Sequence, residues 1–173
     1  MRLLECTLEA HGDGILAILN DAIAHSTALY DYVPRPPESM VGWFETKRQR
    51  QFPVWGAVDD AGNLLGFASY GTFRERPANK YTVEHAVYVT GGARGRGVGG
   101  ALMRRLIQSA EAQQYHVIVG CIDAENAASV AFHEKLGFAH AGTIKQAAFK
   151  FGRWLDLAFY QLTLATPRQP VDG

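Results

Sequence analysis

The chain has 173 residues, 17 basic and 17 acidic side chains, and 47% hydrophobic residues. That length suits one domain with a buried core, and a net charge of zero argues against nucleic acid or an anionic membrane as a partner. Two cysteines, Cys6 and Cys121, are too few for a disulfide framework or a thiolate zinc site, so no metal is expected. No segment reads as a membrane span or a signal peptide, which predicts a cytoplasmic protein.

The first part of the chain predicts two helices followed by a β-hairpin. Ile15, Leu16 and Leu19 recur at helical spacing, and the prolines at 34–37 end that pattern. The turn at 59–63 has the residue types of a hairpin connection. The elements expected here are a strand over 3–6, helices over about 13–24 and 37–50, and strands over 54–58 and 64–73.

The second part alternates strands and helices after a polar loop over 74–80. The elements expected here are strands over 81–89 and 117–122, helices over about 98–113 and 127–136, and final strands over 139–144 and 155–164. Gly137 suits a left-handed helix cap. The whole pattern predicts a single α/β domain over 1–165, with a mixed antiparallel and parallel sheet flanked by helices, and a loose tail over 166–173.

A glycine-rich loop over 91–100 follows one predicted strand and opens a predicted helix. The first turn of a helix leaves amide groups unpaired and carries partial positive charge, so this loop suits a phosphate or pyrophosphate. Arg94 and Arg96 add two cations that can bind phosphate oxygens. A flexible surface loop is the alternative without a ligand.

Two nucleotide motifs fit this loop poorly. A P-loop requires Gly-Lys-Ser/Thr after its glycines, which the sequence lacks. Gly95, Gly97 and Gly100 match the dinucleotide pattern, but five residues separate the strand from the first glycine, where that fold needs a tight turn. A nicotinamide enzyme is therefore a minor alternative.

The segment Arg94-Gly95-Arg96-Gly97-Val98-Gly99 resembles the acetyl-coenzyme A loop of the GCN5-related N-acetyltransferase (GNAT) superfamily. Within that superfamily, the chain is similar to the phosphinothricin, methionine sulfoximine and methionine sulfone acetyltransferases. That similarity rests on the loop and on the segments 32–35, 81–89, 126–138 and 151–156. It implies the GNAT fold and acetyl-CoA as cosubstrate.

Glu84 is the candidate general base, because it is a carboxylate within an otherwise apolar strand and partial burial would raise its pKa. The resemblance points to the same residue. The alternative is a structural carboxylate paired with Arg74, Arg76 or Lys80. Many members use a tyrosine as the acid, but Phe132 stands at that position, so the thiolate could take its proton from solvent or the substrate ammonium. His133 is expected to be a packed or surface helix residue, and Cys121 a core residue without a neighbouring base.

The resemblance also assigns residues to the cosubstrate and to the acceptor. Asn126 and Ser129 could instead simply cap a helix, and a solvated charged loop is the alternative for 74–76. His85 could equally be a hydrogen-bonded strand histidine. The predicted cofactor-binding residues are Val87, Tyr88, Val89, Arg94, Gly95, Arg96, Gly97, Val98, Gly99, Asn126 and Ser129. The predicted substrate-binding residues are Thr27, Tyr30, Arg74, Glu75, Arg76, Tyr81 and His85.

The sequence thus predicts an acetyl-CoA-dependent N-acetyltransferase for the α-amine of a small amino-acid-like acceptor. The alternatives are acetylation of a protein N-terminus or an aminoglycoside, and a coenzyme A-binding domain without turnover. A homodimer is expected by resemblance.

Overall fold

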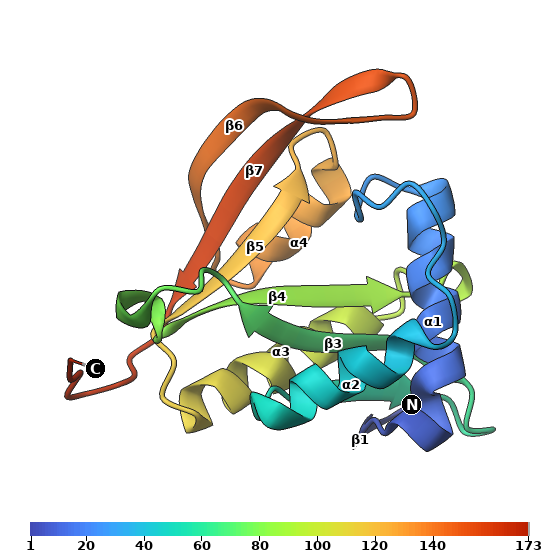
Figure 1. Ribbon diagram of the computed structural model, residues 1–173, viewed down its shortest axis with the longest axis horizontal. Coiled ribbons are helices and arrows are strands. Elements are labelled where there is room, and N and C mark those ends of the chain that lie inside the picture. Colours follow the sequence, from blue (N-terminus) through green and yellow to red (C-terminus); the bar gives the residue numbers. More distant parts are fainter. Residues whose placement is uncertain (173) are drawn as a thin grey trace. The chain divides into compact units, whose positions relative to one another are not determined.

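A computed structural model describes residues 1–172 of the chain (Figure 1). Seven strands form one mixed sheet in the order β1-β2-β3-β4-β5-β7-β6. The strands are β1 (Arg2–Glu5), β2 (Val54–Val58), β3 (Leu64–Thr72), β4 (Thr82–Val89), β5 (Val117–Asp123), β6 (Ala139–Lys150) and β7 (Arg153–Thr163). The helices are α1 (Leu8–His25), α2 (Ser39–Gln49), α3 (Val98–Ala112) and α4 (Ala127–Lys135), with 3-10 turns η1 (Pro77–Asn79) and η2 (Gly91–Ala93). This architecture confirms the predicted α/β class.

The chain groups into two compact units that divide β4 between them. The first unit comprises residues 1–71 and 86–106, and the second comprises 72–85 and the residues from 107 onward. The predicted limits of the catalytic domain, 1–165, stay a prediction. No helix within residues 1–172 is both long enough and apolar enough to cross a membrane.

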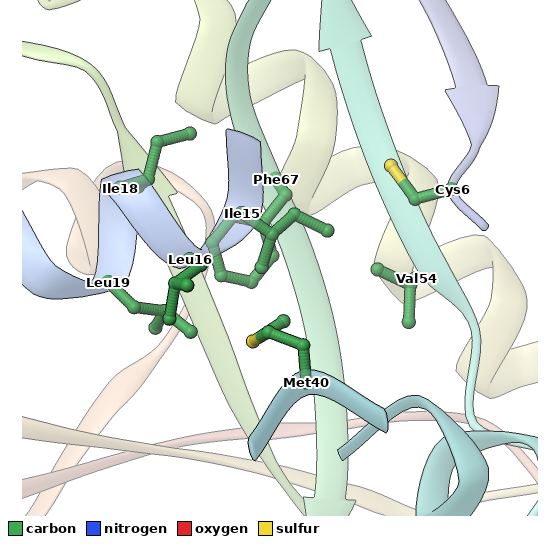
Figure 2. Packing of buried hydrophobic residues seen from close by; sticks show 8 residues of the cluster. All are labelled: Cys6, Ile15, Leu16, Ile18, Leu19, Met40, Val54 and Phe67. Atoms are coloured by element: carbon green, nitrogen blue, oxygen red, sulfur yellow. The ribbon is translucent and has the colours of Figure 1, made fainter. Parts of the chain in front are cut away.

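The first unit holds antiparallel strands β1, β2 and β3 and a core formed with α1 and α2 (Figure 2). The core residues from α1 and β3 include Ile15 and Phe67, which are almost fully buried. In the turn between β2 and β3, the Asp59 carboxylate accepts hydrogen bonds from the amides of Ala61 and Asn63, as the hairpin chemistry predicts. Helix α1 begins five residues earlier than predicted because Thr7 caps it, accepting a hydrogen bond from the Ala10 amide.

The second unit contains β5 between the first half of β4 and β7. β4 and β5 pair in parallel through Thr82↔Val117, Val83↔Ile118 and Glu84↔Val119. β7 pairs antiparallel with β5 and with β6, and Figure 1 shows β6 and β7 as a long hairpin. Helix α4 is capped by Asn126, and Gly137 after it has φ +88°, which confirms the predicted left-handed cap.

Strand β6 extends six residues beyond its predicted end at Ile144. Its register shifts between Ile144 and Ala148, and the bulged segment is held by Asp156 of β7. The Asp156 carboxylate accepts a hydrogen bond from the Gln146 amide at 2.9 Å and pairs with Lys145 at 2.8 Å. Pairing with β7 therefore overrides the weak strand pattern of this polar segment.

Candidate active site

Two glycines of the loop have a backbone conformation that other residues rarely adopt. Gly95 and Gly97 have backbone φ values of +73° and +81°, which residues other than glycine rarely adopt. A Cβ added at either residue would meet nothing within 4 Å, so backbone conformation and not crowding requires these glycines. Arg94 and Arg96 are exposed, and α3 begins directly after the loop at Val98. An accessible helix start with two cations is a suitable cradle for phosphate groups.

The second half of β4 lies in the same unit as this loop. The Tyr88 ring packs against Phe67 of β3 with 5.5 Å between the ring centroids. A Cβ added at Gly66 would lie 2.6 Å from the Tyr88 carbonyl oxygen and 3.1 Å from Val89 Cα, so only glycine allows β3 to approach β4 this closely. Gly66 therefore fixes the backbone path of the predicted cofactor-binding residues Val87, Tyr88 and Val89.

Glu84 belongs to the second unit and lies in the first half of β4. Its side chain is half-buried, and burial raises the pKa of its carboxyl above the ordinary range. The neighbouring Cys121 thiol of β5 lowers the pKa of this carboxyl, but its effect is smaller than that of burial. Within residues 1–172 no ion pair joins Glu84 to Arg74, Arg76 or Lys80. The structure does not contain the predicted alternative of a paired structural carboxylate.

Cys121 is the neighbour of Glu84 that the sequence interpretation missed. Its thiol was expected to be a core group without a neighbouring base, yet it is half-buried and lies beside the Glu84 carboxyl. Strand alternation places Cys121 on the same face as Val119, which is the partner of Glu84 in the parallel ladder. The sequence alone does not give this register, so it carried no signal that the two residues meet.

Asn126 and Ser129 lie at the start of α4 in the second unit. The Asn126 side chain accepts a hydrogen bond from the Ser129 amide at 3.0 Å, so the predicted helix cap is present. The Asn126 amide nitrogen and the Ser129 hydroxyl are polar groups at a helix N-terminus, where the helix dipole favours anions. Their assignment to the cosubstrate stays a prediction.

His85 points to the opposite face of β4 from Glu84 and meets His133 of α4. Their Nε2 atoms lie 2.9 Å apart, and the rings stack with centroids 4.9 Å apart. The Ser129 carbonyl can only accept, so His133 Nδ1 donates to it and His133 Nε2 accepts from His85 Nε2–H. This order leaves His85 Nδ1 as a buried acceptor without a hydrogen-bond partner among residues 1–172. His85 is thus a hydrogen-bonded strand histidine, which is one of its two predicted interpretations.

Burial keeps both imidazoles neutral. It lowers the pKa of His85 to about 3, with a smaller contribution from the charge of His133, and it also lowers the pKa of His133. Gly120 of β5 makes room for the pair, because a Cβ added there would lie 2.6 Å from His85 Nε2 and 3.1 Å from His133 Nε2. The His pair therefore depends on a glycine at this position.

The remaining predicted substrate-binding residues are distributed over two loops and one strand edge. Thr27 and Tyr30 follow α1 in the first unit, where both are half-buried. Arg74, Glu75 and Arg76 lie exposed between β3 and η1 in the second unit. Tyr81 lies just before β4, and its hydroxyl exchanges hydrogen bonds with the backbone of Val171.

Taken separately, the two units present complementary chemistry. The first contains a glycine turn with cations, suited to a diphosphate, and the second contains a half-buried carboxyl with a raised pKa, suited to accepting a proton. Thioester aminolysis requires both functions, since the donor must be held and the amine must lose a proton.

Comparison with known proteins gives a consistent match along most of the chain. Residues 20–138 match the model described as "Acetyltransferase (GNAT) family". An L-methionine sulfoximine/L-methionine sulfone acetyltransferase from Pseudomonas aeruginosa is 45% identical over 155 residues, which are 90% of each chain. The fold matches a solved protein of Acinetobacter baylyi described as an acetyltransferase, with a TM-score of 0.98 and 61% identity over 99% of this chain and 96% of that one. It also matches a phosphinothricin acetyltransferase from Sinorhizobium meliloti in complex with acetyl-CoA, with a TM-score of 0.93 and 30% identity over 98% and 91% of the two chains.

Proposed function

This chain belongs to the acetyltransferase (GNAT) family, and we propose that it transfers the acetyl group of acetyl-CoA to the α-amine of a small amino-acid-like acceptor. The family, the N-acetyltransferase class and the cosubstrate predicted from the sequence are confirmed. Methionine sulfone, methionine sulfoximine and phosphinothricin are the acceptors that the relatives' activities suggest.

In the proposed reaction, Glu84 accepts a proton from the acceptor's ammonium group, directly or through water. The nitrogen then forms a bond to the acetyl carbonyl carbon, and the C–S bond breaks. The coenzyme A thiolate leaves and takes a proton from solvent or from the acceptor, because Phe132 offers no acidic group. The raised pKa of Glu84 carries this proposal, since a carboxylate with an ordinary pKa is a weaker base near neutral pH.

Each unit offers its own contacts to the donor. The first has the turn at 94–99 and the β4 backbone at 87–89, a pairing edge for the pantetheine arm, and the second has Asn126 and Ser129. The positive φ values and the exposure of Gly95 and Gly97 support the contact with the turn. Arg74 and Arg76 are exposed cations that suit an acceptor carboxylate or phosphinate, and Glu75 suits its ammonium.

The test is acetyl-CoA turnover with the three small acceptors, an aminoglycoside and a peptide N-terminus. We expect kcat/KM to be highest for a small acceptor and to fall about 100- to 1000-fold in Glu84→Gln, because the amine loses its base. Glu9→Gln, an exposed residue in the first turn of α1, is the matched control and should retain full activity. Equal turnover in wild type and Glu84→Gln at both neutral and high pH would remove Glu84 from the base role.

We also propose that the enzyme is a cytoplasmic homodimer. Exposed apolar side chains on the β6–β7 hairpin, including Ile144 and Trp154, which are 54% and 58% exposed, support an interface there. Light scattering of wild type and Trp154→Lys tests the dimer: the variant should have the mass of one chain, and a wild-type mass of one chain would contradict the proposal.

A further inference from the structure

We propose that Arg153 of β7, through its ion pair with Asp123 at the end of β5, is a positioning residue for Asn126. The pair fixes the turn between β5 and α4, and this turn determines where the Asn126 side chain presents its NH2 group to coenzyme A. The inference rests on the proposed function, in which Asn126 contacts the donor. All of these residues belong to the second unit.

The turn between β5 and α4 is closed by hydrogen bonds to Asp123. The Asp123 carbonyl oxygen accepts from the Asn126 amide at 2.8 Å, and Asp123 Oδ1 accepts from the Glu125 amide at 3.1 Å. An aspartate side chain that bonds the backbone two residues further on sets the path of the chain locally. The orientation of the Asp123 carboxylate therefore determines the position of the Asn126 backbone.

Arg153 holds the other oxygen of this carboxylate. Arg153 Nη2 donates to Asp123 Oδ2 at 3.2 Å, and the Asp123 side chain is only 2% exposed. A buried carboxylate strongly favours an arrangement that keeps its cation close. Arg153 Nη1 also pairs with Glu125 at 2.7 Å, but the Glu125 side chain is 71% exposed, and a pair this exposed contributes little. The contact with Asp123 is therefore the one that orients the turn.

The backbone of β7 supports the same turn independently of the Arg153 side chain. The Ala124 amide donates to the Asp156 carbonyl oxygen at 2.9 Å, and Asp123 pairs with Leu157 in the antiparallel β5–β7 ladder. These main-chain contacts remain when the charge of Arg153 is removed. Loss of the charge should therefore loosen the turn without detaching β5 from β7.

The Asn126 side chain transmits the position of the turn to its NH2 group. Its amide oxygen accepts from the Ser129 amide at 3.0 Å as the cap of α4. Because the oxygen is committed to the helix, the NH2 group on the same planar amide is the donor that can reach an acceptor oxygen of coenzyme A. A displaced turn therefore displaces this donor.

The experiment compares Arg153→Met, which removes the charge, with Arg153→Lys, which keeps it. The readouts are the Kd of coenzyme A, measured by isothermal titration calorimetry, and the KM for acetyl-CoA. In Arg153→Met both should rise about 3- to 5-fold with kcat within about twofold of wild type, because one hydrogen bond to the ligand is weakened. Arg153→Lys should restore most of the loss. Lys145→Met removes the Lys145–Asp156 pair of the same hairpin and should leave the Kd unchanged.

A double-mutant cycle with Asn126→Ala separates positioning from a general structural role. If Arg153 acts through Asn126, the double variant should bind coenzyme A no more weakly than Asn126→Ala alone. Two effects that multiply, or an unchanged Kd in Arg153→Met, would overturn the inference. If Arg153→Met does not fold, Asp123→Asn takes its place in the cycle with the same expectation: its NH2 group must face either Arg153 or the Glu125 amide, so one of the two contacts is lost.

The binding measurement also keeps this inference distinguishable from the proposed function. A wild-type protein that binds coenzyme A but acetylates none of the amines would overturn the proposed function, and the Kd cycle would still decide the role of Arg153. An unchanged Kd in Asn126→Ala, in an enzyme that turns over, would overturn the role of Arg153 and leave acetyl transfer standing.

Discussion

Two adjacent residues of β4, Glu84 and His85, face opposite sides of the sheet, and burial shifts their pKa values in opposite directions. Burial raises the pKa of Glu84 and lowers that of His85 to about 3, so it opposes the charged form of each. Glu84 is half-buried beside a thiol, whereas His85 Nδ1 is buried in a stack with His133. One strand thus carries a half-buried carboxyl with a raised pKa on one side and a neutral imidazole pair on the other.

The largest effect on stability is expected from Gly120→Ala, which places a side chain against His85. The new Cβ would lie 2.6 Å from His85 Nε2 on adjacent β4, so the free energy of unfolding should fall by about 2–3 kcal/mol. Denaturant unfolding measures this change.

The control is Gly42→Ala in α2, where an added Cβ meets nothing within 4 Å. It should be neutral or stabilising by up to about 1 kcal/mol. The two faces of β4 are independent if the folded Gly120→Ala enzyme shows the same fall of kcat/KM at low pH as wild type. A shift of this fall to another pH would show that the His pair also affects Glu84.

A smaller effect is expected from His85→Gln, whose amide can still donate to His133 but cannot titrate. A pKa of about 3 in the folded chain, against about 6.5 when unfolded, means that the unfolded state binds more protons between these values. This contribution to stability is fully present above pH 6.5 and is lost as the pH falls toward 3. At pH 5 the loss is about 2 kcal/mol.

Denaturant unfolding of wild type and His85→Gln at pH 7, 6 and 5 measures this difference. Wild type should lose more stability than the variant as the pH falls. Glu84 has the opposite sign: its contribution is present below its unfolded pKa and is lost as the pH rises through the raised folded value. Parallel curves for the two proteins would mean that His85 titrates normally in the folded state.

The smallest effect is expected at Asn126, and it sharpens the contrast between a structural cap and a cap that also binds ligand. Asn126→Ala and Thr7→Ala each remove a side chain that accepts a hydrogen bond from the first turn of a helix, α4 and α1 respectively. Each should lose about 1 kcal/mol of stability. Only Asn126→Ala should raise the KM for acetyl-CoA, by a few-fold; equal KM values would leave Asn126 as a cap alone.

The sequence predicted the elements whose pattern is local. The helix over 98–113, the turn at 59–63 and the cap at Gly137 depend on periodicity or on backbone preferences of single residues, and the structure has all three. The end of β6 was misplaced because residues 145–150 form a strand through their partner β7 and not through their own propensity.

The candidate site was predictable to the extent that it follows from one segment of chain. The glycine loop with Arg94 and Arg96 is visible in the sequence, and Glu84 is a carboxylate in an otherwise apolar strand. The contacts with Cys121 and His133 were not predictable, since they require the register of β4 against β5 and the placement of α4. Glycine at 120 reads as an ordinary strand residue until the two imidazoles beside it are known.

The space beside Gly120 limits which residues can occupy positions 85, 120 and 133 together. Positions 85, 120 and 133 lie on three different elements, yet they share one small volume, so a larger residue at 120 becomes tolerable once an imidazole there has been replaced by a shorter side chain. Substitutions at these three sites should therefore be epistatic, and homologous enzymes should exchange them as a set.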